Sequence, residues 1–164
     1  MSLDSVRAFF AERAPDIDVV VTEASSATVA EAAAAHGVEP ARIAKTLTLA
    51  VGERVVLVVA RGDARLDNKK MKATFGAKAK MPDADTVAAL TGHPVGGVCP
   101  FGLATPLPVH CDVSLKAFDV VVPAAGAINA AVFIAPERMA ALTDATWVDV
   151  CREPEAGAEE SAQA

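Results

Sequence analysis

The chain lacks tyrosine altogether, and aromatic residues make up only 4% of its 164 residues. A folded core must therefore be aliphatic, built mainly from valine, alanine, leucine and isoleucine. No apolar run approaches the roughly 18 residues that a membrane-spanning helix needs. The N-terminal segment MSLDSVRAFFAERAP carries acidic residues, unlike a secretory signal. These absences favour a soluble, cytoplasmic protein with no membrane partner.

Cysteine and histidine are also scarce, with three residues of each type. The cysteines form neither a CxxC pair nor a zinc-like pattern, and the histidines show no HxH or HxxxH spacing. The chain also lacks a Walker loop, a GxGxxG motif after a strand and a GxSxG motif. We therefore expect no metal site and no cofactor, and the unpaired cysteines indicate a reducing compartment.

Charge is strongly segregated along the chain. The formal net charge is −6, but residues 40–82 hold ten basic and three acidic residues, a net charge of +7 that leaves −13 for the remainder. A basic patch on an acidic body can attract a polyanion locally. The alternative is a solvated lysine surface that only maintains solubility.

Strand and helix patterns alternate irregularly, which predicts a mixed α/β fold in one domain that spans 1–152. The clearest signal is a hairpin at 43–60, in which Gly52 suits the first position of a type II′ turn. The acidic tail at 153–164 is expected to be disordered. Helices are expected at 2–13, 29–36, 68–75, 85–91 and 136–143, and further strands at 16–22, 107–112, 118–123, 130–135 and 147–151.

Residues 91–102 (TGHPVGGVCPFG) hold four glycines and two prolines in twelve residues. This composition excludes a regular helix or a central strand and predicts a tight, pre-shaped loop. Loops of this kind hold carboxylates, carbonyls or phosphates through exposed main-chain N–H groups. The glycine loop is therefore a candidate binding element, although its composition alone names no ligand.

Lys45 is unusual on the first strand of the predicted hairpin. Its side chain would share one face with four aliphatic residues, whereas Thr46 and Thr48 would lie on the other face. One interpretation is that the lysine snorkels to solvent. The other is that it presents its ammonium to an anionic or carbonyl group in a pocket. The residues alone leave both open.

Cys99 could in principle be a nucleophile of the glycine loop, and His93 lies six residues before it. A nucleophilic cysteine needs a nearby base or a lowered pKa, and spacing within a loop does not establish contact. We favour the alternative, in which Cys99 is a small residue that packs the loop against the core.

Four segments carry a resemblance to a known family: AKTLTL, DNKKMK, the glycine loop TGHPVGGVCPFG and IAPERM. In this order they resemble the YbaK/EbsC family, freestanding relatives of the editing domain of bacterial prolyl-tRNA synthetases. The resemblance covers about residues 16–150. It implies a central mixed, partly barrel-like sheet flanked by short helices, and an aminoacyl-tRNA deacylase that hydrolyses mischarged tRNA in trans.

The resemblance also implies roles for particular residues. Lys45 matches the lysine that the family needs for activity, and the family's loop that holds the 3′ end and the aminoacyl carbonyl maps to Gly96, Gly97 and Pro100. Our own hypothesis is that N–H groups of Gly96 and Gly97 stabilise the developing oxyanion. Cys99 stands where relatives commonly carry serine or another small residue, which weakens it as a nucleophile. The residues expected to contact substrate are Thr46, His93, Val98, Cys99, Pro100, Gly126 and Asn129. Those expected to hold the acceptor stem are Arg61, Lys69, Lys70 and Lys72.

The predicted function is therefore hydrolysis of the ester on a mischarged tRNA that carries alanine, cysteine, serine or threonine, with a tRNA-Pro-like acceptor. The expected partners are mischarged tRNA and, transiently, an aminoacyl-tRNA synthetase, but not DNA. Two alternatives remain. One is an adaptor that binds tRNA or a synthetase without catalysis, and the other is a hydrolase for a different small activated ester.

Overall fold

An antiparallel hairpin forms the centre of the fold. Its strands β2 (Ile43–Val51) and β3 (Arg54–Arg61) pair from Ala44 opposite Arg61 to Val51 opposite Arg54. Gly52 has φ +65° and Glu53 does not have a positive φ, which confirms the predicted type II′ turn. The computed structural model describes residues 2–152, and the predicted tail at 153–164 lies outside the described residues.

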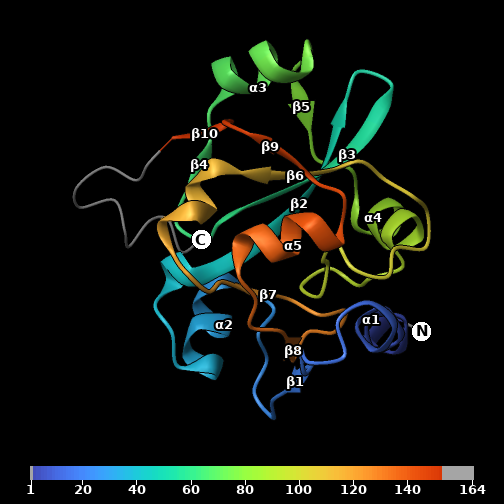
Figure 1. Ribbon diagram of the computed structural model, residues 1–164. Helices are drawn as coiled ribbons and strands as arrows, with labels where there is room; N and C mark the ends of the chain where they lie inside the picture. Colours follow the sequence, from blue (N-terminus) through green and yellow to red (C-terminus); the bar gives the residue numbers. More distant parts are fainter. Residues whose placement is uncertain (1, 153–164) are drawn as a thin grey trace.

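Further strands extend the hairpin into the predicted mixed sheet, in the order β5-β2-β3-β6-β9 (Figure 1). The strands that join it are β5 (Ala79–Lys80), β6 (Val109–Asp112), β7 (Val122–Pro123) and β9 (Thr146–Val148). β6 runs parallel to β3 and β9, β5 is antiparallel to β2, and β7 pairs with β2 in parallel. Two smaller antiparallel pairs are β1 (Val20–Val21) with β8 (Ala130–Ala131), and β4 (Arg65–Leu66) with β10 (Cys151–Arg152).

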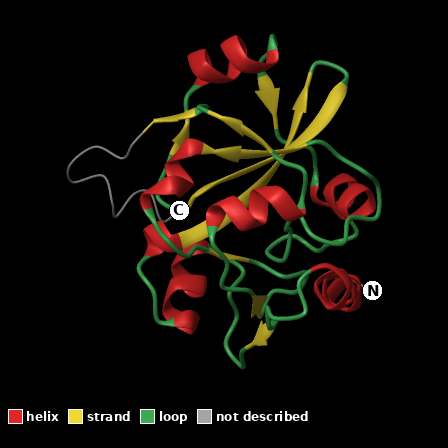
Figure 2. Ribbon diagram, viewed as in Figure 1, coloured by secondary structure: helices red, strands yellow, loops and turns green. Residues whose placement is uncertain are grey.

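Short helices surround the sheet (Figure 2). They are α1 (Ser2–Arg13), α2 (Val29–His36), α3 (Asn68–Phe75), α4 (Ala84–Thr91) and α5 (Pro136–Leu142), with 3-10 turns at η1 (Pro40–Arg42) and η2 (Val113–Ala117). Thr28 and Asp67 accept hydrogen bonds from first-turn N–H groups, and Gly37 and Gly76 end their helices in the left-handed conformation. These caps explain why the helices begin and end as predicted. Within residues 2–152, no helix is long and apolar enough to cross a membrane.

Several strands are shorter than predicted. In 107–112 only the last four residues pair, because Pro108 has no N–H to donate to a ladder. The strand expected at 147–151 is split between β9 and β10, and there the buried Asp112 carboxylate accepts the N–H of Val150 at 2.8 Å. Shorter pairings also replace the strands expected at 16–22, 118–123 and 130–135.

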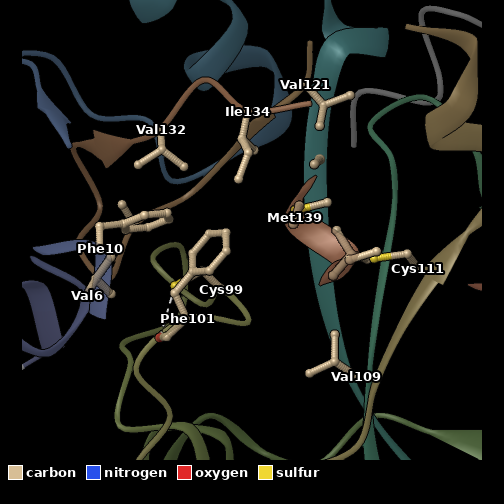
Figure 3. Close-up of a cluster of buried hydrophobic side chains, with 14 of the residues drawn as sticks. Val6, Phe10, Cys99, Phe101, Val109, Cys111, Val121, Val132, Ile134 and Met139 are labelled. Atoms are coloured by element: carbon tan, nitrogen blue, oxygen red, sulfur yellow. Dashed lines mark hydrogen bonds between the residues drawn. The ribbon is translucent and has the colours of Figure 1, made fainter. Parts of the chain in front are cut away.

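The main core joins α1 to the glycine loop (Figure 3). The rings of Phe10 and Phe101 are almost fully buried, with centroids 4.7 Å apart. A Cβ added at Gly102 would lie 2.7 Å from the main-chain oxygen of Ser5 in α1. The loop therefore approaches α1 so closely that this glycine is required for packing.

Candidate active site

A cavity of about 420 Å³ opens beside the first half of β2. Its walls come from β2, the segments that begin α2 and α4, strands β7 and β8, and the loop residues Val95, Gly96 and Val98. The lining is mainly apolar, which is typical of small-molecule sites. We call this space the glycine-loop cavity. Of the predicted site residues, it brings together Lys45, Thr46, Gly96 and Val98.

Lys45 lies at the wall of the glycine-loop cavity but is half-buried. Its Nζ donates a hydrogen bond to the carbonyl of Ala64, in the turn between β3 and β4. Burial lowers the pKa of Lys45, and the neighbouring Cys151 and Asp63 oppose that shift. The ammonium is thus held inside the protein and does not extend freely to solvent, as snorkelling would require.

Thr46 and Thr48 line the same cavity from the other face of β2. Within residues 2–152 neither hydroxyl has a hydrogen-bond partner, although both oxygens are buried. A buried hydroxyl without a partner costs on the order of 1–3 kcal/mol. Thr48 is only 5% exposed and is not among the predicted site residues. The sequence could have identified Thr48, because residues two positions apart on a strand share a face and Thr46 was already predicted to line the site.

The main chain of the glycine loop is less free than its composition suggests. Gly97 donates its N–H to the carbonyl of Pro94 at 2.8 Å, and its own carbonyl accepts the N–H of Gly126 at 3.0 Å. A Cβ at Gly97 would lie 2.7 Å from the nitrogen of Ala127. The expectation that the Gly97 N–H is bare for a ligand is therefore wrong, because the loop uses that donor to hold its own shape.

His93 belongs to the glycine loop but is buried, with 1% of its surface exposed. Its Nε2 is 2.7 Å from the carbonyl of Phe101, so this nitrogen carries the proton and donates. The Nδ1 atom lies 2.6 Å from the hydroxyl of Ser2, whose single proton goes either to this nitrogen or to the carbonyl of Gly126. Burial lowers the pKa of His93. The residue links α1 to the loop and does not line the glycine-loop cavity.

Cys99 is fully buried beside Phe101 (Figure 3). Burial raises the pKa of its thiol to about 12, so the thiol stays protonated near neutral pH. Its Sγ is 3.5 Å from the Nε2 of His93, but that nitrogen already donates to a carbonyl and cannot act as a base. The packing role favoured from the sequence fits this environment.

The remaining predicted substrate contacts also lie outside the cavity wall. Pro100 is buried, and Gly126 lies so close to α1 that an added Cβ would come within 2.7 Å of the Ser2 carbonyl oxygen. Asn129 donates from Nδ2 to the carbonyl of Thr22 at 2.9 Å. Gly126 and Asn129 therefore contact neighbouring segments of the protein and not the cavity.

The sequence interpretation missed most of the apolar residues that line the cavity, among them two large exposed side chains. Met81 is 68% exposed and Val95 is 60% exposed, yet both border the glycine-loop cavity. Exposed apolar side chains at the mouth of a cavity are typical of ligand sites. Met81 follows β5 and Val95 belongs to the loop, so only the fold brings them together.

The predicted tRNA-binding residues divide between two places. Arg61 and Lys70 line a second space of about 390 Å³ on the side of Ala64 and Asp112, which we call the charged cavity. Arg61 forms a two-point ion pair with Asp63, whose shorter contact is 2.6 Å, and Lys70 contacts Asp149 at 3.0 Å. Lys69 and Lys72 are exposed on α3.

Residues 23–142 match the aminoacyl-tRNA editing domain family, and the chain therefore belongs to that family. The match contains every element that lines the glycine-loop cavity. The fold and the resemblance predicted from the sequence are confirmed.

Particular relatives sharpen this assignment. The chain is 47% identical over 155 residues to the uncharacterized protein YwhH of Bacillus subtilis (strain 168), covering 93% of this chain and 99% of that protein. It is 34% identical over 103 residues to the proline–tRNA ligase of Geobacter sp. (strain M21), covering 62% of this chain but only 18% of that enzyme. A crystal structure of a protein described as a candidate trans-editing enzyme for prolyl-tRNA synthetase superposes with a TM-score of 0.85 at 32% identity, covering 92% of this chain and 97% of that one.

Proposed function

We propose that this chain is a trans-editing deacylase, which hydrolyses the ester between a tRNA-Pro-like acceptor and a wrongly attached alanine, cysteine, serine or threonine. The observation that carries the proposal is that Lys45, Thr46 and Gly96 line one cavity within the segment that matches the editing domain. Its volume of about 420 Å³ is at the small end of the range for ligand cavities, which favours a small aminoacyl group.

The reaction requires little covalent machinery, because the ester that joins an amino acid to tRNA is already activated. A water molecule adds to the ester carbonyl carbon, the bond from that carbon to the ribose oxygen breaks, and the ribose oxygen takes up a proton. The products are a free amino acid and an uncharged tRNA. The protonated state of the Cys99 thiol supports a route without a cysteine nucleophile.

Lys45 and the loop are the proposed catalytic groups. The ammonium of Lys45 has three protons and donates one to the Ala64 carbonyl, so it can also anchor the terminal phosphate or polarise the ester. Gly96 lines the cavity and is the proposed oxyanion donor of the loop. Gly97 acts in this proposal by fixing the loop through its bond to Pro94.

The basic residues of α3 are proposed to hold the acceptor stem. Lys69 and Lys72 are exposed on that helix, which suits phosphate contacts. Phosphate contacts release counterions, so kcat/KM should fall steeply as salt is raised. In a double variant Lys69→Ala/Lys72→Ala, the slope of log kcat/KM against log salt concentration should become shallower by about 2, one for each lost phosphate contact, while the fold stays intact.

The decisive test uses tRNAs charged with alanine, cysteine, serine or threonine. The wild type should release at least one of these amino acids, and Lys45→Ala should slow release by about 100-fold or more. Lys78→Ala is the matched control for loss of a lysine, because Lys78 is exposed and lies outside the proposed site, and it should retain most activity. Full activity in a folded Lys45→Ala variant would contradict the proposed mechanism. Release from none of the four tRNAs by the wild type would instead favour a non-catalytic adaptor.

A further inference from the structure

One edge of β2 is only partly paired. Its partner β5 covers Ala50 and Val51, and its partner β7 covers Ile43 and Ala44. Between them, residues 45–49 have no strand partner on this side, although all of them pair with β3 on the other side. The unpaired stretch faces the glycine-loop cavity, which residues 43–48 line.

The hairpin turn fixes which main-chain groups point to the open edge. Across a two-residue turn the flanking residues, here Val51 and Arg54, form a hydrogen-bonded pair, and such pairs alternate along an antiparallel ladder. The N–H and C=O groups of Leu49, Leu47 and Lys45 therefore point to β3. Those of Thr46 and Thr48 point to the open edge.

These groups have no partner within residues 2–152. No main-chain hydrogen bond connects Thr46 or Thr48 to another segment on that side, and their hydroxyls are also unpaired. Main-chain groups in a protein interior are almost always hydrogen-bonded. A short row of unpaired donors and acceptors along a cavity wall therefore indicates a binding edge.

The length of the gap limits what can bind. β5 and β7 close it at both ends, so only five residues separate the paired stretches. A strand from a second copy of the chain would collide with these neighbours. A single residue can enter, because one amino acid carries an N–H group and a C=O group at the spacing that one residue of a partner strand offers.

We infer that the aminoacyl group of the substrate binds to this edge as a one-residue extension of the sheet. The α-ammonium donates to the carbonyl of Thr46 or Thr48, and the ester carbonyl accepts the N–H of the same residue. This inference rests on the proposed function and adds to it. The edge recognises the α-amino acyl unit common to all the candidate amino acids, and its N–H polarises the ester in addition to Gly96.

Residue-resolved amide exchange tests this directly. The probe is 3′-alanylamido-3′-deoxyadenosine, in which an amide replaces the labile ester, added at about 1 mM to 15N-labelled full-length protein. We expect exchange at Thr46 or Thr48 to slow by about tenfold or more, as a new hydrogen bond requires. The amide of Leu47, which points to β3, is the internal control and should change far less. A propionylamido probe without the amine should bind about tenfold more weakly.

Two results would overturn the inference. One is a shift of the Gly96 amide resonance, which reports occupancy of the cavity, with unchanged exchange at both threonines. The other is no binding of the alanylamido probe at all. Neither result contradicts the proposed function if the wild type still releases amino acids from mischarged tRNA. Conversely, a wild type that releases none would contradict the proposed function whatever the exchange shows.

Discussion

Two cavities, one lined by Lys45 and the other by its hydrogen-bond partner Ala64, are similar in volume, about 420 and 390 Å³, but opposite in chemistry. In the charged cavity, Arg61 is paired with Asp63 and Lys70 with Asp149, and Asp112 accepts main-chain N–H groups. The glycine-loop cavity is mainly apolar. Its polar residues Ser26, Thr28 and Lys45 have hydrogen-bond partners, but the hydroxyls of Thr46 and Thr48 have none within residues 2–152. Satisfied polar groups stabilise a fold, whereas unsatisfied ones are free for a ligand. The difference supports the glycine-loop cavity as the proposed site.

The largest effect is expected from breaking the charged cavity at Asp112. This carboxylate is 1% exposed and accepts the N–H groups of Ser114 and Val150 at 2.9 and 2.8 Å. Because Asp112→Ala leaves the buried donor of Val150 and the part-buried donor of Ser114 without an acceptor, it should lower the free energy of unfolding by about 3–5 kcal/mol in urea titrations. Asp149→Asn is the control, since its ion pair with Lys70 is exposed, and it should barely shift the midpoint. Equal midpoints for the two variants would contradict a structural role for this cavity.

A smaller effect is expected at the loop of the other cavity. The Cβ of Gly97→Ala would meet the main chain of Ala127 at 2.7 Å, which cannot move aside cheaply. The variant should lose about 2–3 kcal/mol of stability and about tenfold or more in deacylation, because the loop shifts. Gly37→Ala is matched as a glycine substitution in open space, with φ +67° and no atom within 4 Å. It should cost only about 1 kcal/mol and leave activity unchanged. Wild-type activity in Gly97→Ala would show that loop shape is not critical.

The sequence predicted local features of the fold well. Helix α2 starts after Thr28 and ends before Gly37 as predicted, and Gly52 lies in the predicted turn. These features were predictable because each depends on hydrogen bonds within a few residues. The strand ends were predicted less accurately. Whether residues 147–151 form one strand depends on Asp112, 38 residues before Val150, which takes the N–H that a ladder would use. The alternation of apolar and polar residues along the chain cannot show that a distant side chain will take a main-chain N–H from a strand.

The site was predicted in part for the same reason. Lys45, Thr46 and Gly96 line one cavity, and each was predicted because it belongs to a short motif that can be recognised in the sequence. The glycines of the loop were interpreted as freedom for main-chain donors, but Gly97 and Gly102 are needed because other segments pack against them. Glycine content alone cannot distinguish an open loop from a tightly packed one, since both need the missing side chain.

Two buried threonines sharpen the comparison, because their valine variants should change stability in opposite directions. Thr91 is 0% exposed, donates to the carbonyl of Val87 at 2.7 Å and accepts the N–H of His93 at 3.1 Å. Thr91→Val should therefore destabilise the protein by about 1–2 kcal/mol. Thr48 has no hydroxyl partner, so Thr48→Val should be neutral or stabilising by about 1 kcal/mol. Destabilisation of both variants by the same amount would contradict the absence of a partner at Thr48.

The smallest expected effect is the pH dependence of stability that comes from His93, the buried histidine of the glycine loop. Burial lowers the pKa of His93 below its ordinary value of 6.5, so the unfolded chain binds a proton more readily than the folded one. Stability from this residue is therefore complete above pH 6.5 and falls as the pH drops from there toward the folded pKa. Between pH 7.5 and 5.5 the loss should be at most about 1.4 kcal/mol, in a range where carboxylates hardly titrate.

His93→Gln isolates that contribution from the other two histidines. Burial also lowers the pKa of His36 and His110, so the variant should keep part of the pH dependence and lose the share due to His93. The comparison is the slope of unfolding free energy against pH, and not its absolute value, because the variant also loses contacts with Ser2 and Phe101. An unchanged slope would mean that the imidazole protonates as easily in the folded protein as in the unfolded one. The burial of the imidazole would then not be enough to keep His93 neutral in the folded protein.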